Sequence, residues 1–328
     1  MLRIEGLSIE FRTEHGWVRV VDGVDLRVGQ GQTVGLVGES GSGKTVTSLA
    51  VMGLLPRDDS RIPNGSIRLA GRELVGLSET ELADIRGAEV AMIFQEPRRS
   101  LDPAFTVGDQ IAEVFRRHRG LSRKAAMAEA ARMLDAVGIA DARRRINDYP
   151  HQFSGGMCQR VMLAMALACE PKLLIADEPT TALDVTVQAE MLALMNELQA
   201  ETGVSILFIT HDLAVVAEMC DIVTVMYAGQ VVEVSPLYDM FGRPQHPYTE
   251  GLLAAIPGAS AADRRLRAIP GVVPAPWDLP AGCRFHPRCE YALAGRCDNA
   301  TVPLRSSPDG RLVRCARTGE IELTGVGE

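Results

Sequence analysis

The first part of the chain alternates apolar with polar residues. This alternation runs through residues 2–12 and 17–28, and it predicts two half-buried strands that pair in antiparallel fashion. A third, shorter strand is expected at 66–69, between turn-forming residues at 64–65 and 70–71. These strands would form a small antiparallel layer.

Four later runs are apolar almost throughout, as strands are when both faces of a parallel sheet are covered. Helical patterns separate them, and a hairpin ends the series. Strands that alternate with helices predict right-handed crossovers and a mostly parallel sheet. The expected strands are 34–37, 90–94, 172–177 and 204–210, with the hairpin at 222–227 and 230–234, and the expected helices are 44–55, several within 97–170, and 185–201.

The segment between the strand at 34–37 and the following helix carries the first chemical signal. It reads GESGSGKT and fits the pattern G-x-x-x-x-G-K-S/T at every fixed position. Glycines allow backbone N–H groups to turn toward a phosphate, and the positive end of the helix adds to the attraction. Lys44 would bridge the β- and γ-phosphates of a nucleoside triphosphate, and Thr45 would ligate Mg²⁺. The predicted contacts come from Gly38, Ser40, Gly41, Ser42, Gly43, Lys44 and Thr45.

Composition and charge narrow the class of protein. The 328 residues are 46% hydrophobic with a net charge of −8, which is ordinary for a globular protein and argues against binding nucleic acid through general basicity. No apolar run approaches the 18 residues of a membrane span, and the N-terminus lacks the pattern of a signal peptide. We therefore expect a cytoplasmic protein whose cysteines are mostly reduced unless they hold a metal.

A second glycine-rich turn precedes the helical run at 158–168. The turn reads Phe153-Ser-Gly-Gly-Met157, and it offers another helix N-terminus where an anion could bind. One phosphate does not need two such sites on one subunit. At this point the sequence resembles the nucleotide-binding subunits of ABC transporters, whose signature motif is Leu-Ser-Gly-Gly-Gln and, in peptide importers, commonly Phe-Ser-Gly-Gly-Met. The resemblance runs from about Leu2 to Pro257.

The resemblance implies an α/β P-loop ABC ATPase with a mostly parallel core sheet, an antiparallel β subdomain and an α-helical subdomain at about 97–170. Residues 1–257 would form this nucleotide-binding domain. Two such subunits would pair head to tail with two ATP molecules between them. Each ATP would lie between 38–45 of one subunit and the signature turn of the other, contacted in trans by Ser154, Gly155, Gly156 and Met157.

The same resemblance assigns roles near the γ-phosphate. Asp177 and Glu178 end an apolar strand, at the sheet edge where ligands gather in open α/β folds. Asp177 would support Mg²⁺ through water, and Glu178 would act as the general base. Gln95 resembles the glutamine that reaches Mg²⁺ and the attacking water, and His211 the histidine that contacts the γ-phosphate. Asp184 lies in Ala182-Leu183-Asp184, which matches the loop that crosses the dimer interface.

Adenine recognition and the coupling surface are less distinct in the sequence. The family stacks an aromatic residue on adenine, and the corresponding turn here offers His15 and Trp17, either of which could stack. Residues 95–103 and 105–108 resemble the loop and helical subdomain that receive coupling helices from a membrane subunit. Residues 246–257 and 282–289 look like the C-terminal extension of oligopeptide and dipeptide importer ATPases, which nickel and some sugar importers share.

The resemblance therefore implies the ATP-hydrolysing subunit of an importer of di- and oligopeptides, on the cytoplasmic face of the inner membrane. Its partners would be two transmembrane permease subunits, a second ATP-binding subunit that is identical or paralogous, and indirectly an extracytoplasmic substrate-binding protein. No nucleic acid partner is expected. The alternatives are an ATPase for nickel or another small solute, and a soluble ABC ATPase that acts outside transport.

The tail at 258–328 would comprise a linker to about Pro280 and a small extension with four cysteines. Five, seven and seventeen residues separate these cysteines, so no C-x-x-C pair supports a zinc ribbon. Two disulfides are not expected in a reducing compartment. Four thiolates can hold an iron–sulfur cluster, and the resemblance implies a 4Fe–4S cluster here, with zinc and free thiols as alternatives. The four residues are Cys283, Cys289, Cys297 and Cys315.

Overall fold

The computed structural model describes residues 1–181, 183–256 and 268–326. Two units make up the chain, and each is described by itself. One unit contains residues 29–32 and 76–207, and the other contains 2–28, 33–75 and 208–328. Ala182, part of the predicted interface loop, and residues 257–267, the first part of the predicted linker, lie outside the described residues.

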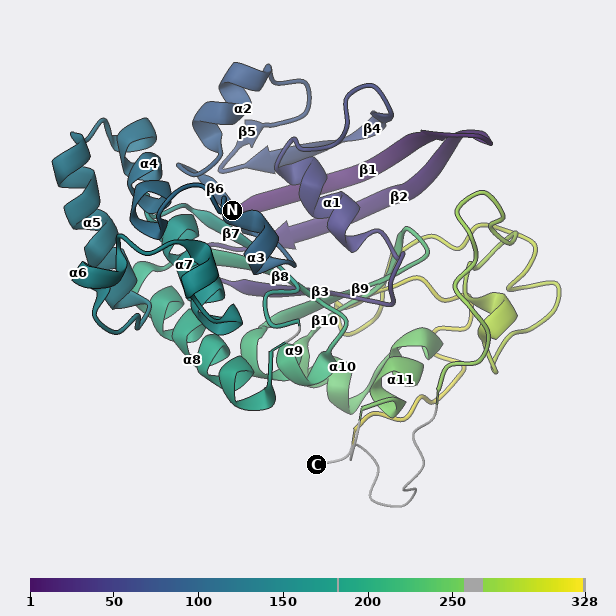
Figure 1. Ribbon diagram of the computed structural model, residues 1–328. Coiled ribbons are helices and arrows are strands. Elements are labelled where there is room, and N and C mark those ends of the chain that lie inside the picture. Colours follow the sequence, from purple (N-terminus) through teal and green to yellow (C-terminus); the bar gives the residue numbers. More distant parts are fainter. Residues whose placement is uncertain (182, 257–267, 327–328) are drawn as a thin grey trace. The chain divides into compact units, whose positions relative to one another are not determined.

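The antiparallel layer belongs to the second unit and contains four strands in the order β2-β1-β4-β5. The strands β1 (Leu2–Thr13) and β2 (Gly16–Val28) pair antiparallel, as the alternation predicted, and form the long purple ribbons of Figure 1. β4 (Ser60–Leu69) adds to β1, and β5 (Arg72–Glu73) adds to β4. The small layer expected from the sequence is confirmed.

The predicted start of β4 is wrong. Asn64-Gly65 lies inside the strand and not in a turn before it. The register of β1 against β4 shifts between Glu5 and Ser8, next to this position. Gly65 has φ 107°, and a Cβ there would lie 2.5 Å from the Cα of Leu7, so glycine permits a bulge that brings the two backbones together.

The second unit also holds one end of the core sheet, in the order β11-β12-β10-β9-β3. β3 (Thr33–Val37) runs parallel to β9 (Ile222–Tyr227), and β10 (Gln230–Pro236) returns antiparallel to β9 as the predicted hairpin. The tail adds β12 (Leu312–Val313) to β10 and β11 (Arg305–Ser306) to β12. These last pairs were not predicted, because two-residue strands show no periodicity.

The helices of the second unit are α1 (Lys44–Val51), α9 (Leu213–Met219), α10 (Leu237–Gly242), α11 (Pro247–Ala254) and the short 3₁₀ turn η2 (His286–Arg288). The predicted end of α1 at Leu55 is wrong. The helix stops at Val51 because Gly53 adopts a left-handed conformation, with φ 62°, ahead of the proline that was expected to stop it.

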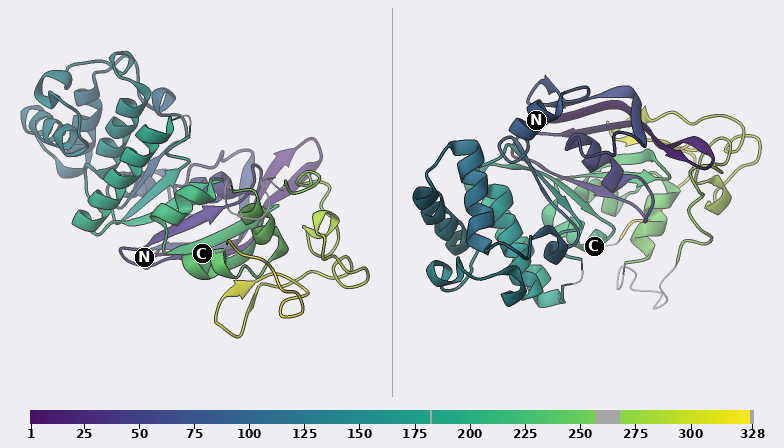
Figure 2. Two further views of the ribbon diagram at one scale, coloured as in Figure 1. Left: turned by 90° about the horizontal axis from the view of Figure 1, so that it is seen from below. Right: turned by 45° about the horizontal axis from the view of Figure 1, so that its top comes forward.

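The first unit combines two parallel strands with most of the helices. β6 (Val90–Ile93) pairs with β7 (Leu173–Asp177), and both strands are buried throughout. The helices α4 to α7 gather in one group, drawn in blue to teal in Figure 2. The helices are α2 (Glu79–Ile85), α3 (Pro97–Ser100), α4 (Val107–Arg119), α5 (Arg123–Ala136), α6 (Ala142–Arg145), η1 (Pro150–Gln152), α7 (Gly155–Leu167) and α8 (Val185–Thr202).

Local chemistry accounts for both ends of α5. Ser122 caps α5 by accepting a hydrogen bond from the Ala125 N–H, and Gly138 follows the helix with φ 73°, as predicted.

β8 (Ser205–Thr210) contains the point where the chain passes from the first unit to the second. Within the described residues, no helix has the length and apolar character that crossing a bilayer requires.

Candidate nucleotide-binding site

The phosphate loop joins β3 to α1 and depends on glycine at both of its ends. Gly38 has φ 152°, and a Cβ there would lie 2.1 Å from the carbonyl oxygen of Met226. Gly43 caps α1 with φ 100°, a left-handed conformation that side chains disfavour. The N–H of Gly229 donates to the Ser42 carbonyl at 2.9 Å. The loop therefore rests on the β9–β10 turn, in a backbone path that few other residues could follow.

The side chain of the loop lysine folds back onto the loop backbone that precedes it in the sequence. Lys44 is 6% exposed, and its Nζ donates to the carbonyl oxygens of Gly38 at 2.7 Å and Glu39 at 3.0 Å. Ser42 is buried beneath it, whereas Ser40, Gly41 and Thr45 are exposed. The loop thus combines exposed residues, a cation and a hydroxyl at the start of a helix, which together suit a phosphate group.

The acidic pair at the end of β7 lies in the first unit. Asp177 is 3% exposed. Glu178 has φ 48°, an unusual conformation for a residue with a side chain, and such strain is concentrated at functional sites. Its Oε2 accepts hydrogen bonds from Gln95 Nε2 at 2.6 Å and from Thr181 Oγ1 at 3.0 Å. The structure therefore brings together Glu178 and Gln95, which the sequence separates widely.

The second glycine-rich turn starts α7. Ser154 is the N-cap and accepts a hydrogen bond from the Met157 N–H at 3.3 Å. A Cβ at Gly155 would meet no atom within 4 Å, so the start of this helix is open on that side. Asp184 caps α8 by accepting from the Val187 N–H at 3.0 Å. The cap gives Asp184 a local structural role besides the interface role predicted for it.

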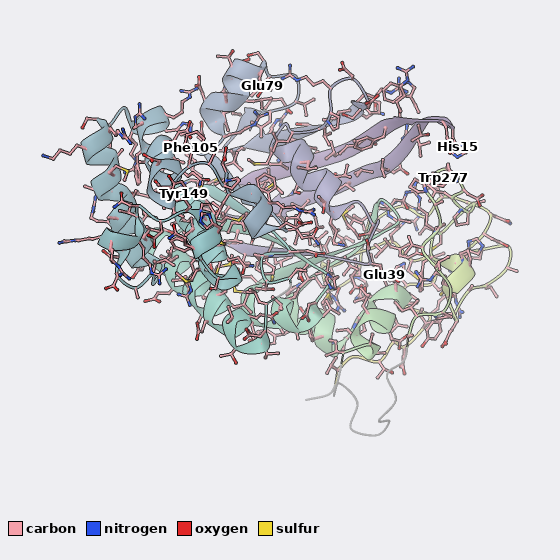
Figure 3. All side chains as sticks on the ribbon, in the orientation of Figure 1. His15, Glu39, Glu79, Phe105, Tyr149 and Trp277 are labelled. Atoms are coloured by element: carbon pink, nitrogen blue, oxygen red, sulfur yellow. The ribbon has the colours of Figure 1, made fainter. Side chains whose placement is uncertain are left out.

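An aromatic cavity of about 280 Å³ lies beside the turn between β1 and β2. His15 and Trp277 face each other with ring centroids 5.2 Å apart, and Figure 3 labels both. Trp17 is 42% exposed, and the Arg61 guanidinium lies 4.3 Å from its ring centre. Sequence reasoning missed Trp277, because an isolated aromatic residue in a proline-rich tail forms no pattern. The lining residues are His15, Trp17, Val18, Arg19, Pro276 and Trp277.

His211 follows β8 in the second unit and is exposed. Its predicted neighbours, Asp177 and Glu178, belong to the first unit. The two aromatic candidates for adenine stacking, His15 and Trp17, share one unit with Lys44. The predicted phosphate and adenine contacts therefore come from one unit, and the predicted catalytic carboxylates come from the other.

The four tail cysteines line one cavity together with His246, Phe285 and Tyr291. The Cys283 N–H donates to the Cys297 carbonyl at 2.8 Å, which ties two of them through the backbone. Burial raises the pKa of the Cys283 and Cys315 thiols, and that of Cys289 to about 12. Among the described residues, no three histidine, cysteine or acidic side chains are placed to hold one metal ion. The thiols thus surround a space without converging on a single point.

Comparison with known families finds two matches. The family described as ABC transporter matches residues 21–181, and the family described as oligopeptide/dipeptide transporter, C-terminal region, matches residues 232–297. Among solved structures, the ATP-binding cassette MJ0796, a dimer in a post-hydrolysis state bound to ADP and Pi, is similar with a TM-score of 0.64 and 27% identity. That similarity covers 72% of this chain and 99% of the other.

Curated relatives are similar over nearly the whole length. A protein of Brucella abortus (strain 2308) described as a peptide import ATP-binding protein is 51% identical, covering 98% of both chains. The oligopeptide transport ATP-binding protein AppD of Bacillus subtilis (strain 168) is 50% identical over 96% of both chains. The α/β cassette fold predicted from the sequence is confirmed, and the chain belongs to the ABC transporter ATP-binding proteins of the oligopeptide/dipeptide importer family.

Proposed function

We propose that this chain is the ATP-hydrolysing subunit of an ABC importer that powers uptake of di- and oligopeptides across the cytoplasmic membrane. The observation that carries the proposal is one chain in which an ABC transporter match at 21–181 is followed by a peptide-transporter C-terminal match at 232–297. Residues 1–257 would be the nucleotide-binding domain, with its helical subdomain at about 97–170. Residues 258–328 would be the linker and the extension.

In the proposed binding step, the phosphate loop holds the triphosphate of ATP. Backbone N–H groups of residues 38–45 and the Lys44 ammonium neutralise phosphate charge, and the Thr45 hydroxyl would ligate Mg²⁺. The family resemblance implies that Asp177 supports Mg²⁺ through water. Bound Mg²⁺ would supply charge stabilisation for the transferred phosphoryl group. The Thr45 hydroxyl fits a hard cation, since oxygen ligands are what Mg²⁺ prefers. Most of the rate enhancement would come from this positioning and charge stabilisation.

In the proposed hydrolysis step, Glu178 accepts a proton from the attacking water. The Gln95 amide donates to Oε2 of Glu178, so it holds the carboxylate in one orientation. We propose that Gln95 also reaches Mg²⁺ and that His211 contacts the γ-phosphate. These two roles rest on the family resemblance alone.

The proposed active unit is a pair of ATP-binding subunits. The open N-terminus of α7 supports a trans contact between residues 154–157 and the γ-phosphate bound by the other subunit. Asp184 would lie at the same interface. The similar cassette MJ0796 is described as a dimer, which supports a paired state for this chain. The second subunit would be a paralogue or a second copy.

The other proposed partners are two transmembrane permease subunits and, through them, an extracytoplasmic binding protein. We propose that this chain binds the permease subunits at the inner face of the membrane. Co-purification of a tagged chain from detergent-solubilised membranes tests the proposal. We expect two hydrophobic subunits in the complex and ATPase activity that peptide-loaded binding protein stimulates. Stimulation by nickel-loaded binding protein alone would mean that the cargo is nickel and not peptide. A complex with ribosomes or nucleic acid would contradict the transport role.

Adenine is proposed to bind in the aromatic cavity, stacked on the ring of His15 or Trp17 with Trp277 opposite. The strand β2 carries Trp17 to Val20 over about 10 Å at ~3.3 Å per residue, and the Val20 carbonyl lies beside Gly43 of the phosphate loop. In ATP a comparable length separates the base from the phosphates. The chain contains only two tryptophans, and both line this cavity.

Tryptophan fluorescence therefore reports directly on the proposed adenine site. In Trp17→Phe the only remaining tryptophan is Trp277, and we expect ATP to quench its emission. We also expect Trp277→Ala to raise the Kd for ATP by about tenfold, because one lost stacking face is worth ~1–3 kcal/mol. Tyr238→Ala is the matched control, since Tyr238 is an exposed aromatic residue of α10 that does not line the cavity. Unchanged emission and affinity in these variants would remove Trp277 from the site.

We propose that the four tail cysteines bind a 4Fe–4S cluster. The family resemblance implies this cluster, and the four thiols line one cavity, although no three metal-ligating side chains among the described residues are placed to hold a metal ion. The cluster would close a tail with few secondary-structure elements, and binding would displace thiol protons.

Metal analysis after anaerobic purification decides this point. We expect about four iron and four sulfide per chain, brown colour and absorption toward the blue end of the visible range. Cys289→Ser should lose the colour, whereas Cys220→Ser, a buried cysteine of the second unit outside the cavity, should keep it. Stoichiometric zinc, or thiols that react fully with no metal present, would each overturn the cluster.

A further inference from the structure

A short piece of the tail is anchored to the phosphate loop. Residues 283–289, here called the cysteine segment, begin and end at two cysteines of the cavity. Within the segment, Arg288 is 7% exposed as a residue, and its guanidinium forms two hydrogen bonds with the carboxylate of Glu39. The Nη1–Oε2 and Nη2–Oε1 distances are 2.8 and 3.0 Å. Glu39 is the second residue of the phosphate loop, directly after Gly38.

The arginine is itself fixed in place. Its Nε donates to the Pro270 carbonyl at 2.8 Å, and its guanidinium lies 5.7 Å from the centre of the Tyr227 ring. Burial by itself would lower the pKa of Arg288, but the hydrogen bonds to Glu39 raise it above its ordinary value, so the side chain stays charged. A planar fork held at three points can set the position of a carboxylate more closely than a flexible ammonium can.

The backbone of Glu39 is held as well. Its N–H donates to the hydroxyl of Tyr248 at 2.8 Å, and the Tyr248 ring packs against Phe285 of the cysteine segment with centroids 5.3 Å apart. Phe285 also contacts Tyr227 edge-on at 5.2 Å. Side chain and backbone of the same loop residue therefore both depend on the cysteine segment and its aromatic neighbours.

A second arginine of the segment supports the opposite end of the loop. Arg284 Nη1 donates to the Ala228 carbonyl and Nη2 to Asp22, each at 2.5 Å. Ala228 and Gly229 form the turn whose N–H donates to the Ser42 carbonyl. The two arginines thus reach the loop near both of its ends, at Glu39 directly and at Ser42 through the turn.

We propose that the cysteine segment clamps the phosphate loop and that Arg288 is a positioning residue for the nucleotide phosphates, acting through Glu39. This inference rests on the proposed nucleotide binding. Phosphate contacts lose strength when N–H groups move by fractions of an ångström. Arg288 also neutralises a carboxylate that lies within the anion-binding loop, where an unpaired negative charge would repel the triphosphate.

A double-mutant cycle tests the clamp on the full-length protein, with the Kd for MgATP measured by calorimetry. We expect Arg288→Gln to raise the Kd by roughly 10- to 100-fold. Adding Glu39→Gln removes the unpaired carboxylate, so the double variant should recover most of the lost affinity. Arg288→Lys, which keeps the charge without the fork, should show a smaller loss and provides a test if Arg288→Gln does not fold.

Arg311→Gln is the matched control. Arg311 is another buried arginine of the tail, 6% exposed, but its partners are Asp309 and the carbonyls of Asp239 and Arg243, and none of these belongs to the phosphate loop. It should lower the Tm without changing the Kd for MgATP. An unchanged Kd in both Arg288 variants, or a loss that Glu39→Gln does not reverse, would overturn the clamp. A wild-type chain that fails to bind ATP would instead contradict the proposed function.

Discussion

Replacing Glu178 by glutamine is expected to lower kcat for ATP hydrolysis by roughly 10²- to 10⁴-fold while ATP still binds. An amide has nearly the shape of a carboxylate but cannot accept the proton of the attacking water. The hydrogen bond from Gln95, at 2.6 Å, identifies a carboxylate that is already oriented. The Glu178 backbone, with φ 48°, does not depend on the side-chain charge, so the fold should be retained. Steady-state phosphate release and equilibrium binding of ATP measure the two effects separately.

Glu197→Gln is the control for this substitution. Glu197 is exposed on α8, in the same unit as Glu178, and loss of its charge should leave kcat unchanged. Near-normal hydrolysis by Glu178→Gln would remove Glu178 from the role of general base. Loss of ATP binding together with turnover would instead give it a structural role.

Replacing Lys44 by alanine is expected to raise the Kd for MgATP by roughly 100-fold or more. A hydrogen bond to a charged group is worth ~1.5–3 kcal/mol, and the lysine is proposed to contact two phosphates. The ammonium also donates to the carbonyls of Gly38 and Glu39, so its loss leaves acceptors of the loop without their partner. Calorimetry with MgATP measures the Kd, and circular dichroism checks that the variant is folded.

Lys124→Ala is the control for Lys44→Ala, because Lys124 is exposed on α5 and removes the same charge from the chain. It should leave the Kd unchanged. An affinity for MgATP in Lys44→Ala close to that of the wild type would mean that the loop at 38–45 does not hold the phosphates.

The sequence predicted most of the fold because periodicity and turn chemistry act locally. The alternation at 2–12 and 17–28 located β1 and β2, and the apolar run before Glu178 located β7. The prediction of strand boundaries failed where the same residues can form either of two local structures. Asn64-Gly65 is a common hairpin turn, yet here the glycine serves a bulge within β4, set by the approach of the Leu7 backbone. The pairing of β4 with β1 decides between a turn and a bulge, and these strands are far apart in the sequence.

The phosphate loop could be predicted because the residues proposed to contact the phosphates are adjacent in the sequence. The proposed catalytic pair could not be derived in this way, because Gln95 and Glu178 follow different strands and meet only when β6 and β7 pair. Their assignment needed the family resemblance. Trp277 and Arg288 escaped prediction altogether, since each reaches its partner across most of the chain and neither belongs to a repeated pattern.

In the proposed pair of subunits, ATP held by one subunit is completed by the glycine-rich turn of the other. The most direct test is the sedimentation mass of Glu178→Gln with MgATP, alone and mixed with any ATP-binding subunit that co-purifies with the wild-type chain. We expect MgATP to produce a species with two ATP-binding subunits and two bound ATP molecules. A species with a single subunit in both samples, at ATP concentrations that saturate binding, would contradict it.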